Sequence, residues 1–149
     1  PNVIRGNASE IMVLAQQANS TKGVDSTMQT EDAVSGAIEL SKKLNNTVVV
    51  SGKVDYIITG DKINTISNGS VLMPKVTGMG CSATAIIGAC IAIESDIHLA
   101  CTTAMAIMGI AGDMAAELSK GPGSFQVNFL DSLYLLTGDI IKDKIKLNA

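Results

Sequence analysis

The order of apolar and polar positions along the chain predicts helices that alternate with strands. Residues 2–5 have the composition of a short strand end, which Gly6 and Asn7 follow as a turn and a helix cap. A polar break at residues 20–23 precedes a second helix, which is expected from about Thr30 and ends in lysines that suit its negative terminus. The first helix carries apolar side chains on one face: Ile11, Leu14, Ala15 and Ala18.

Residues 47–50 are β-branched or apolar throughout, which indicates a strand buried on both faces and completes a βαβ unit. Three short extended pieces follow at residues 55–59, 62–67 and 71–76. Asn68-Gly69 lies between the last two, and this dipeptide favours a β-hairpin. We therefore expect an antiparallel meander at one edge of the sheet.

The chain changes character after Gly80. Helices rich in small residues are predicted at about residues 82–93 and 99–118, and Gly121-Pro122-Gly123 breaks the chain after them. A last amphipathic helix then carries Phe125, Phe129, Leu130, Leu133 and Leu136. Together the elements predict an α/β fold, with a mainly parallel sheet that has an antiparallel edge and flanking helices, followed by a helical cap.

The composition of the chain excludes several classes of protein. The 149 residues are enough for one globular domain, and with 46% hydrophobic residues the chain can bury enough surface to fold, which excludes disorder. Its 11 Lys and Arg residues are scattered among 14 Asp and Glu, and only 3% of residues are aromatic, so nucleic-acid binding is not expected. Three cysteines without a C-x-x-C pair or a preceding secretory leader indicate a reducing cytoplasm.

Two apolar runs, at residues 79–93 and 97–112, raise the question of a membrane-spanning helix. Each is shorter than the roughly 18 to 20 residues that cross the hydrocarbon layer. Glu94, Asp96 and His98 separate the two runs. A buried helical hairpin is therefore favoured, and no membrane association is expected.

The glycine-rich segment at residues 75–83 is the strongest local candidate for chemistry. Gly78 and Gly80 stand where an extended segment meets a helix, so that backbone N–H groups and the helix N-terminus can bind an anion. Cys81 falls in the first turn, where a thiol is activated as a base or nucleophile. The alternative for this cysteine is a small buried hydrophobe, which is the reading we adopt for Cys90 and Cys101.

Two further patterns, a glycine fingerprint and the single histidine, do not indicate a functional site. The string Gly78-x-Gly80-x-x-Ala83 satisfies the dinucleotide fingerprint, but the chain continues into helices without the next strand and its acidic residue, so a nicotinamide site is not expected. His98, the only histidine, lies near Asp96 without a second ligand or nucleophile at a recognisable spacing.

Polar side chains also follow the predicted strands. Arg5 ends the first strand, and Asn7 and Glu10 lie three residues apart in the first helical turn, where their oxygens can hold Mg²⁺ through waters. The alternative for this pair is a capping box with Asn7 as the N-cap. Ser51 brings a hydroxyl to the carboxyl edge of the sheet, where open α/β sheets bind ligands, unless it is only a surface turn residue.

Taken in order, these segments resemble the hydroxyethylthiazole kinases of thiamine biosynthesis and salvage. The resemblance covers essentially the whole chain and corresponds to the carboxy-terminal part of such an enzyme, without its first strands. Five motifs carry it: Pro1-Asn-Val-Ile-Arg-Gly-Asn-Ala-Ser-Glu10, Gly23-Val-Asp-Ser26, Val48-Val-Val-Ser-Gly-Lys-Val-Asp-Tyr56, Lys75-Val-Thr-Gly-Met-Gly-Cys81 and Gly121-Pro-Gly-Ser-Phe-Gln126.

The resemblance implies a ribokinase-like α/β fold, of which residues 1–149 form the carboxy-terminal, nucleotide-binding part of a single domain. It implies transfer of the γ-phosphate of ATP to the hydroxyl of 4-methyl-5-(2-hydroxyethyl)thiazole with Mg²⁺. It also implies a cytoplasmic homotrimer with active sites between subunits.

The site residues are assigned by the same resemblance. Arg5 and Ser51 match nucleotide-contacting positions, with Ser51 where threonine is common, and Asn7 and Glu10 match the N-x-x-E element that organises Mg²⁺ and phosphates. Gly78 matches a substrate-contacting glycine. Gly78, Met79 and Gly80 are expected to form an anion hole, and Cys81 stands where the wider superfamily has an aspartate as catalytic base.

Two alternatives stay open at this point. An ATP-dependent NAD(P)H-hydrate dehydratase shares the fold and similar elements, although it normally keeps the aspartate that Cys81 replaces. The other is an inactive fragment that assembles only with a partner.

Overall fold

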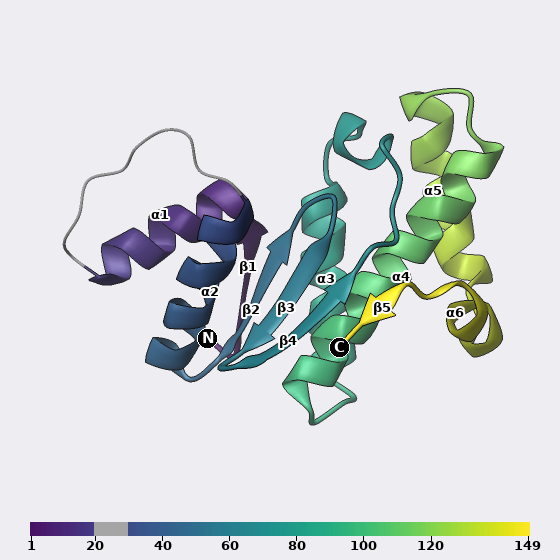
Figure 1. Ribbon diagram of the computed structural model, residues 1–149. Coiled ribbons are helices and arrows are strands. Elements are labelled where there is room, and N and C mark those ends of the chain that lie inside the picture. Colours follow the sequence, from purple (N-terminus) through teal and green to yellow (C-terminus); the bar gives the residue numbers. More distant parts are fainter. Residues whose placement is uncertain (20–29) are drawn as a thin grey trace. The chain divides into compact units, whose positions relative to one another are not determined.

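The computed structural model describes residues 1–19 and 30–149 (Figure 1). Contacts divide the chain into two compact units: unit 1 consists of Pro1–Thr65 with Ala149, and unit 2 of Ile66–Asn148. The motif from Gly23 to Ser26 lies outside the described residues.

Unit 1 alternates strands and helices, as the sequence predicts. Its elements are β1 (Val3–Asn7), α1 (Ala8–Asn19), α2 (Thr30–Leu44), β2 (Thr47–Ser51), β3 (Asp55–Thr59) and β4 (Lys62–Ile66), whose last residue is the first of unit 2. Strand β1 continues through Gly6 and Asn7, which were expected to form a turn, because both residues pair with β2. Asn7 thus ends the strand and also caps the helix.

The strands form a mixed sheet in the order β1-β2-β3-β4. Strands β1 and β2 are parallel, from Val3 opposite Thr47 to Asn7 opposite Ser51, which confirms the predicted βαβ unit. Strand β3 turns back and pairs antiparallel with β2. Because β1 and β2 are parallel, their carboxyl ends bring Asn7 and Ser51 to the same edge.

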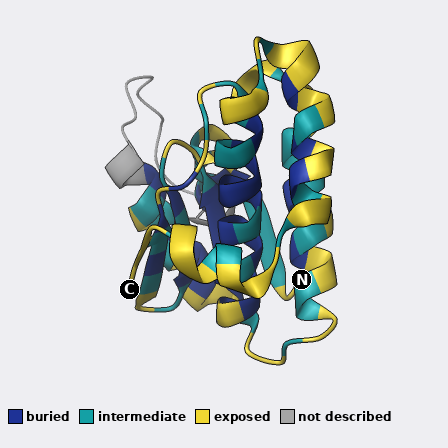
Figure 2. Cartoon of the chain, turned by 90° about the vertical axis from the view of Figure 1, so that its right-hand side faces the viewer, coloured by how far each residue is buried: buried dark blue, intermediate teal, exposed yellow. Residues whose placement is uncertain are grey.

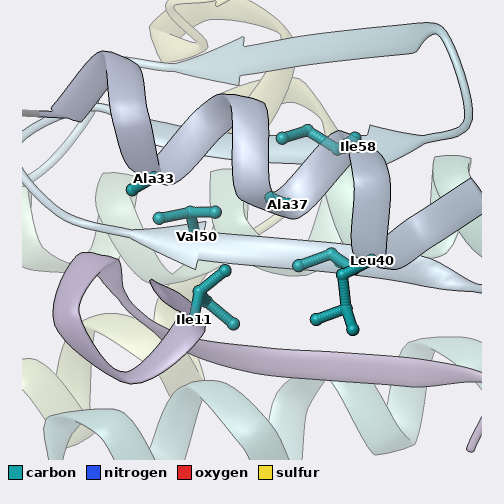
Figure 3. Packing of buried hydrophobic residues seen from close by; sticks show 7 residues of the cluster. Ile11, Ala33, Ala37, Leu40, Val50 and Ile58 are labelled. Carbon is teal, nitrogen blue, oxygen red and sulfur yellow. The ribbon is translucent and has the colours of Figure 1, made fainter. Parts of the chain in front are cut away.

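The core of unit 1 lies between its helices and β2. Val48, Val49 and Val50 are at most 2% exposed, so this strand is buried on both faces as predicted. Leu14 is 41% exposed although it was expected on the buried face, because the stripe that α1 buries runs through Ile11 and Ala15. Figure 3 shows side chains of the main cluster: Ile11, Ala33, Ala37, Leu40, Val50 and Ile58.

Unit 2 is mainly helical. Its elements are the short 3-10 helix η1 (Met73–Lys75), α3 (Met79–Ile91), α4 (Ile97–Leu118), α5 (Pro122–Leu135), α6 (Gly138–Lys144) and the two-residue β5 (Leu147–Asn148). Helix α4 packs against α3, α5 and α6 and supplies most of the buried residues of this unit (Figure 2). Small residues on α4 allow this close packing, as the composition indicated.

Helix α4 is long and apolar enough to cross a membrane, as judged by length and composition alone. Its 22 residues exceed the predicted apolar run because the helix continues through Asp113 and Glu117. In the structure, 67% of its most apolar stretch is buried. Packing against α3 and α5 accounts for this burial, and α3 and α4 form the predicted helical hairpin.

The predictions for unit 2 are wrong in two places. Residues 71–76 form a turn and η1 rather than a strand, so no hairpin forms at Asn68-Gly69. The last predicted helix corresponds to α5, and α6 was not predicted: Leu136 is extended and ends α5, and Thr137 caps a new helix through its hydroxyl. Of the expected apolar face, Phe125 and Phe129 are buried, whereas Leu130 is 62% exposed.

Candidate active site

The side chain of Arg5 reaches from β1 to the end of β2. Its Nη2 donates a hydrogen bond of 2.7 Å to Ser51 Oγ, and Ser51 Oγ in turn donates to the Gly6 carbonyl at 3.2 Å. The parallel register makes this contact possible, since Arg5 lies opposite Val49 and its long side chain spans the remaining two residues. A cation and a hydroxyl are thereby joined at the carboxyl edge of the parallel pair, where α/β sheets bind ligands.

Asp55 is a charged neighbour of this pair that the sequence analysis missed. It begins β3, is 7% exposed, and accepts a hydrogen bond of 2.9 Å from the Gly52 N–H through Oδ1. Burial raises the pKa of the Asp55 carboxyl to about 6, although the Gly52 N–H and the Arg5 charge oppose this shift. The sequence does contain a signal for it, because Asp55 follows Ser51 after only three residues and a turn of that length places the two side by side.

The Arg5 guanidinium is incompletely hydrogen-bonded in the part of the chain that the structure describes. Its Nε is buried and has no hydrogen-bond partner there. The side chain is half-buried, so its charge is only partly screened by water. An anion that reaches this edge would interact with the charge of the guanidinium.

Asn7 and Glu10 form the capping box that was the alternative to a metal site. Asn7 Oδ1 accepts from the Glu10 N–H at 2.9 Å, and Glu10 Oε2 accepts from the Asn7 N–H at 2.7 Å. Ser9 Oγ also donates to Asn7 Oδ1, at 2.8 Å. The cap holds both side chains in place at the start of α1.

This arrangement also fits a hydrated magnesium ion. Asn7 and Glu10 are exposed, and each carboxylate oxygen of Glu10 can accept more than one bond. Mg²⁺ prefers oxygen ligands, keeps several waters and is commonly held by one or two side chains together with substrate phosphates. Among the described residues there is no group of three His, Cys, Asp or Glu side chains that could hold a metal by itself.

In unit 2 the glycine-rich segment leads directly into α3. The helix begins at Met79, three residues before the predicted start, because Gly78 is its N-cap with a φ of 95° and the Ser82 N–H already donates to the Gly78 carbonyl. No side chain caps this terminus. The N–H groups of the first turn, at Met79, Gly80 and Cys81, are therefore left for a ligand or water.

The three cysteines are free thiols in different surroundings. Cys81 is exposed in the first turn of α3. Burial raises the pKa of Cys90, and burial together with the nearby Cys90 raises the pKa of Cys101 to about 11, which keeps both protonated at neutral pH. Cys101 and His98 lie on the buried face of α4, in keeping with a structural role.

The predicted site residues are therefore divided between the units. In unit 1, Arg5, Asn7 and Ser51 lie at one edge of the sheet, and Glu10 lies beside Asn7 in the first turn of α1. Residues 78–81 form the start of one helix in unit 2. Each group has a geometry suited to anions: a cation with a hydroxyl in the first, and uncapped N–H groups in the second.

A model of the hydroxyethylthiazole kinase family matches residues 1–139. The chain belongs to the hydroxyethylthiazole kinase family. The predicted resemblance is thus confirmed over nearly the whole sequence.

Curated relatives support the same assignment. The hydroxyethylthiazole kinase of Leptospira biflexa is 50% identical over 145 residues, which are 97% of this chain and 54% of that protein. The hydroxyethylthiazole kinase of Syntrophus aciditrophicus is 47% identical over 150 residues, covering 100% of this chain and 56% of that protein. The chain thus spans about half the length of the curated relatives it matches.

A solved structure is also similar. The hydroxyethylthiazole kinase protein from Pyrococcus horikoshii OT3 matches with a TM-score of 0.87 and 33% sequence identity, over 99% of this chain and 54% of that one. This match confirms the predicted ribokinase-like α/β fold class.

Proposed function

We propose that this chain is the carboxy-terminal, nucleotide-binding part of a ribokinase-like kinase domain. The whole enzyme transfers the γ-phosphate of ATP to the hydroxyl of 4-methyl-5-(2-hydroxyethyl)thiazole in thiamine biosynthesis or salvage. Family membership over residues 1–139 and the names of the relatives support this proposal. They do not favour the NAD(P)H-hydrate dehydratase, since none of the relatives named above carries that name.

The observation that carries the proposal is the contact between Arg5 and Ser51. A half-buried cation and a hydroxyl, joined at 2.7 Å at the carboxyl ends of parallel strands, suit the phosphates of a nucleotide. Phosphoryl transfer asks a protein mainly to position the groups and to stabilise the charge on the transferred phosphoryl. In this proposal, Arg5 and Ser51 contact ATP and orient it.

The start of α3 serves the transferred phosphoryl group in the same proposal. The N–H groups that follow Gly78, at Met79 and Gly80, form an anion hole, and Gly78 itself contacts the thiazole alcohol. Cys81 acts as the base that accepts the proton of the substrate hydroxyl. The hydroxyl oxygen then forms its bond to the γ-phosphorus, the bond to the bridging oxygen breaks, and ADP leaves with that electron pair.

Asn7 and Glu10 would hold Mg²⁺ through its waters, chiefly through the carboxylate of Glu10, because Asn7 Oδ1 already accepts two hydrogen bonds within the cap. When bound, the ion neutralises charge on the phosphates of ATP. We further propose a cytoplasmic homotrimer with active sites between subunits.

The test is a calorimetric titration of the purified, folded chain with MgATP. We expect binding by the unmodified chain and a loss of about tenfold or more in affinity for Arg5→Ala, because a charge-assisted hydrogen bond is removed. Lys62→Ala is the matched control, since it removes one exposed cation from β4. Equal affinity in all three proteins, or no binding by the folded chain, would contradict a nucleotide site formed by these residues.

A second assay addresses the substrate class. A complete family member whose carboxy-terminal half is this sequence is expected to phosphorylate the thiazole alcohol and to leave hydrated NADH unchanged. Activity on hydrated NADH without phosphorylation of the thiazole alcohol would instead support the NAD(P)H-hydrate dehydratase.

A further inference from the structure

We propose that Asn7 binds the nucleotide as a hydrogen-bond donor: its side-chain amide presents Nδ2 to a phosphate oxygen, and Ser9 is the positioning residue that fixes this orientation. The inference rests on the proposed function and refines it. Glu10 is left to hold the metal ion, whereas Asn7 contacts the phosphates directly.

The cap at the start of α1 occupies the carbonyl oxygen of the Asn7 amide. Oδ1 accepts from the Glu10 N–H at 2.9 Å and from Ser9 Oγ at 2.8 Å. A carbonyl oxygen has two lone pairs, so both of its acceptor positions are used. A metal ion binds a side-chain amide through this oxygen, and a metal-bound water would donate to it. Asn7 Oδ1 is therefore not available to Mg²⁺ or to its waters.

The same bonds determine which way the amide is turned. The oxygen and the nitrogen of an asparagine side chain are distinguished by their partners, and the backbone N–H of Glu10 can only donate. The atom that it contacts is therefore the oxygen. The Asn7 N–H also donates to Glu10 Oε2 at 2.7 Å, which holds the residue in the cap. None of these bonds engages Nδ2, and Asn7 is exposed, so its two N–H donors are open to a ligand.

Ser9 fixes the amide through a bond that the capping box does not require. In such a box the oxygen of the N-cap residue needs only the backbone N–H three residues on, here that of Glu10. Ser9 adds a second donor to the same oxygen. An amide can swing about a single hydrogen bond, whereas two donors on one oxygen restrict its plane. Ser9 is itself exposed, so the burial of its hydroxyl is not the reason for this bond.

The register of the parallel strands brings the Asn7 amide to the nucleotide groups. Asn7 lies opposite Ser51, and Ser51 Oγ accepts from Arg5 Nη2 at 2.7 Å. Arg5 supplies a cation and Asn7 a pair of N–H donors at the same edge of the sheet. The oxygens of an ionised phosphate are acceptors only, so these donors match it in charge and in hydrogen bonding.

Glu10 has the opposite character. Its Oε2 accepts from the Asn7 N–H, but an ionised carboxylate has about four acceptor sites, so several remain for other donors. Metal-bound waters are such donors, and Mg²⁺ usually keeps several of them. The two side chains of the N-x-x-E element thus offer a donor for phosphate and an acceptor for the hydrated ion.

The test compares Asn7→Asp with Gln16→Glu. Aspartate keeps the shape of the side chain and an oxygen that caps the helix, and it removes the amide donor. Gln16→Glu is the matched control, because it makes the same amide-to-carboxylate change further along α1. A third variant, Asn7→Ser, is a neutral cap without the amide, which separates the loss of the donor from the added charge. Circular dichroism establishes that the variants fold.

The first readout is the affinity for MgATP, measured by calorimetry. We expect both Asn7 variants to bind about fivefold or more weakly than the unmodified chain, because one hydrogen bond to a charged group is lost, and Gln16→Glu to bind unchanged. If Asn7 held the metal through its oxygen, Asn7→Asp would bind as tightly as the unmodified chain or more tightly, since a carboxylate is a good ligand for Mg²⁺. That result, or undiminished binding by Asn7→Ser, would overturn the inference.

The second readout is the pair of NMR signals from the Asn7 Nδ2 amide, assigned by their disappearance in Asn7→Asp. ATP added with EDTA, which removes free metal, is expected to shift these signals, because the amide donates to a phosphate. Signals that stay in place while ATP is bound would refute the donor role.

The role of Ser9 is tested with the same signals. In Ser9→Ala we expect them to move in the nucleotide-free chain and the affinity for MgATP to fall about two- to threefold, because the amide is less restrained. Ser9→Thr should restore both properties, since it keeps the hydroxyl. Unchanged signals and unchanged affinity in Ser9→Ala would show that Ser9 does not position Asn7.

Failure of the proposed function has a different signature. If the folded, unmodified chain binds no MgATP, the nucleotide site is wrong and the inference fails with it. If the unmodified chain binds MgATP and both Asn7 variants bind it equally well, the proposed function stands and only the inference fails.

Discussion

Asn68 donates a hydrogen bond of 2.9 Å to the Asp113 carboxylate, 45 residues further along the chain. The Gly69 N–H donates to the other oxygen of the same carboxylate at 3.0 Å. Asn68 also donates to the Lys144 carbonyl and accepts from the Lys146 N–H at 2.7 Å. Within unit 2 one buried amide thus joins the segment after β4 to α4 and to the end of the chain.

Substituting Asn68 is therefore expected to destabilise unit 2 strongly. Asn68→Ala removes three hydrogen bonds and leaves partly buried partners unsatisfied, which should lower the free energy of unfolding by about 3 kcal/mol. Urea denaturation measures the change, with Asn148→Ala in the exposed β5 as the control. A loss no larger than that of the control would mean that the network contributes little.

Gly78, the N-cap of α3, and Gly88, inside the helix, should respond in opposite ways to the same substitution. A Cβ would meet nothing within 4 Å at either Gly78 or Gly88, but Gly78 has a φ of 95°. Gly78→Ala is expected to cost about 1 to 2 kcal/mol through backbone strain, whereas Gly88→Ala should stabilise the helix by about 0.5 to 1 kcal/mol. Thermal unfolding of the two variants checks this, and a change of the same sign in both would contradict it.

Asp55 should make the stability of the chain depend on pH. Burial raises the pKa of the Asp55 carboxyl from 3.8 to about 6 in the folded state. The folded state therefore favours the protonated carboxyl, so this contribution to the free energy of unfolding is fully present below pH 3.8 and is lost as the pH rises through about 6. Asp55→Asn and the unmodified chain should be about equally stable near pH 4. At pH 8 the variant should be more stable, on the order of 2 kcal/mol.

Denaturation of both proteins at several pH values measures this difference. A variant that loses stability at pH 8 would show that attraction to Arg5 outweighs the cost of burial.

Cys81 should tolerate an acidic replacement better than an apolar one. A carboxylate can accept the proton of the substrate hydroxyl and a methyl group cannot, so Cys81→Asp should keep or raise kcat. Cys81→Ala should lower kcat at least tenfold, which corresponds to about 1.4 kcal/mol or more in the activation free energy. The assay is phosphorylation of the thiazole alcohol by a complete family member with this carboxy-terminal half. An unchanged kcat in Cys81→Ala would remove the cysteine from the role of base.

The isolated chain should show little or no turnover. It spans about half the length of its relatives, and we expect much of the alcohol pocket to come from the part that it lacks. Incubation with MgATP and the thiazole alcohol, followed by chromatographic detection of the phosphate ester, tests this. Appreciable product formation would mean that these residues are sufficient for catalysis.

The sequence by itself determined the order and type of most elements and the family. The apolar run at residues 47–50 predicts a buried strand, and the helical spacing of Ile11 and Ala15 predicts the buried face of a helix. Both patterns involve residues that are close in the sequence. The parallel pairing of β1 and β2 was also predicted, because parallel strands need a long, usually helical, crossover and the sequence places helices between these two strands. The candidate residues Arg5 and Ser51 were found in this way, as polar groups at the ends of predicted strands.

Only the tertiary structure decided how polar side chains are used. Asn68-Gly69 has the local chemistry of a hairpin, yet Asn68 bonds to residues 45 and more positions away, and the chain does not turn back. Asp55 looked like the first residue of a strand, and its relation to Arg5 and Ser51 depends on strand register and burial. Such contacts join residues distant in sequence, and their free energy depends on which groups folding buries together, which no local pattern contains.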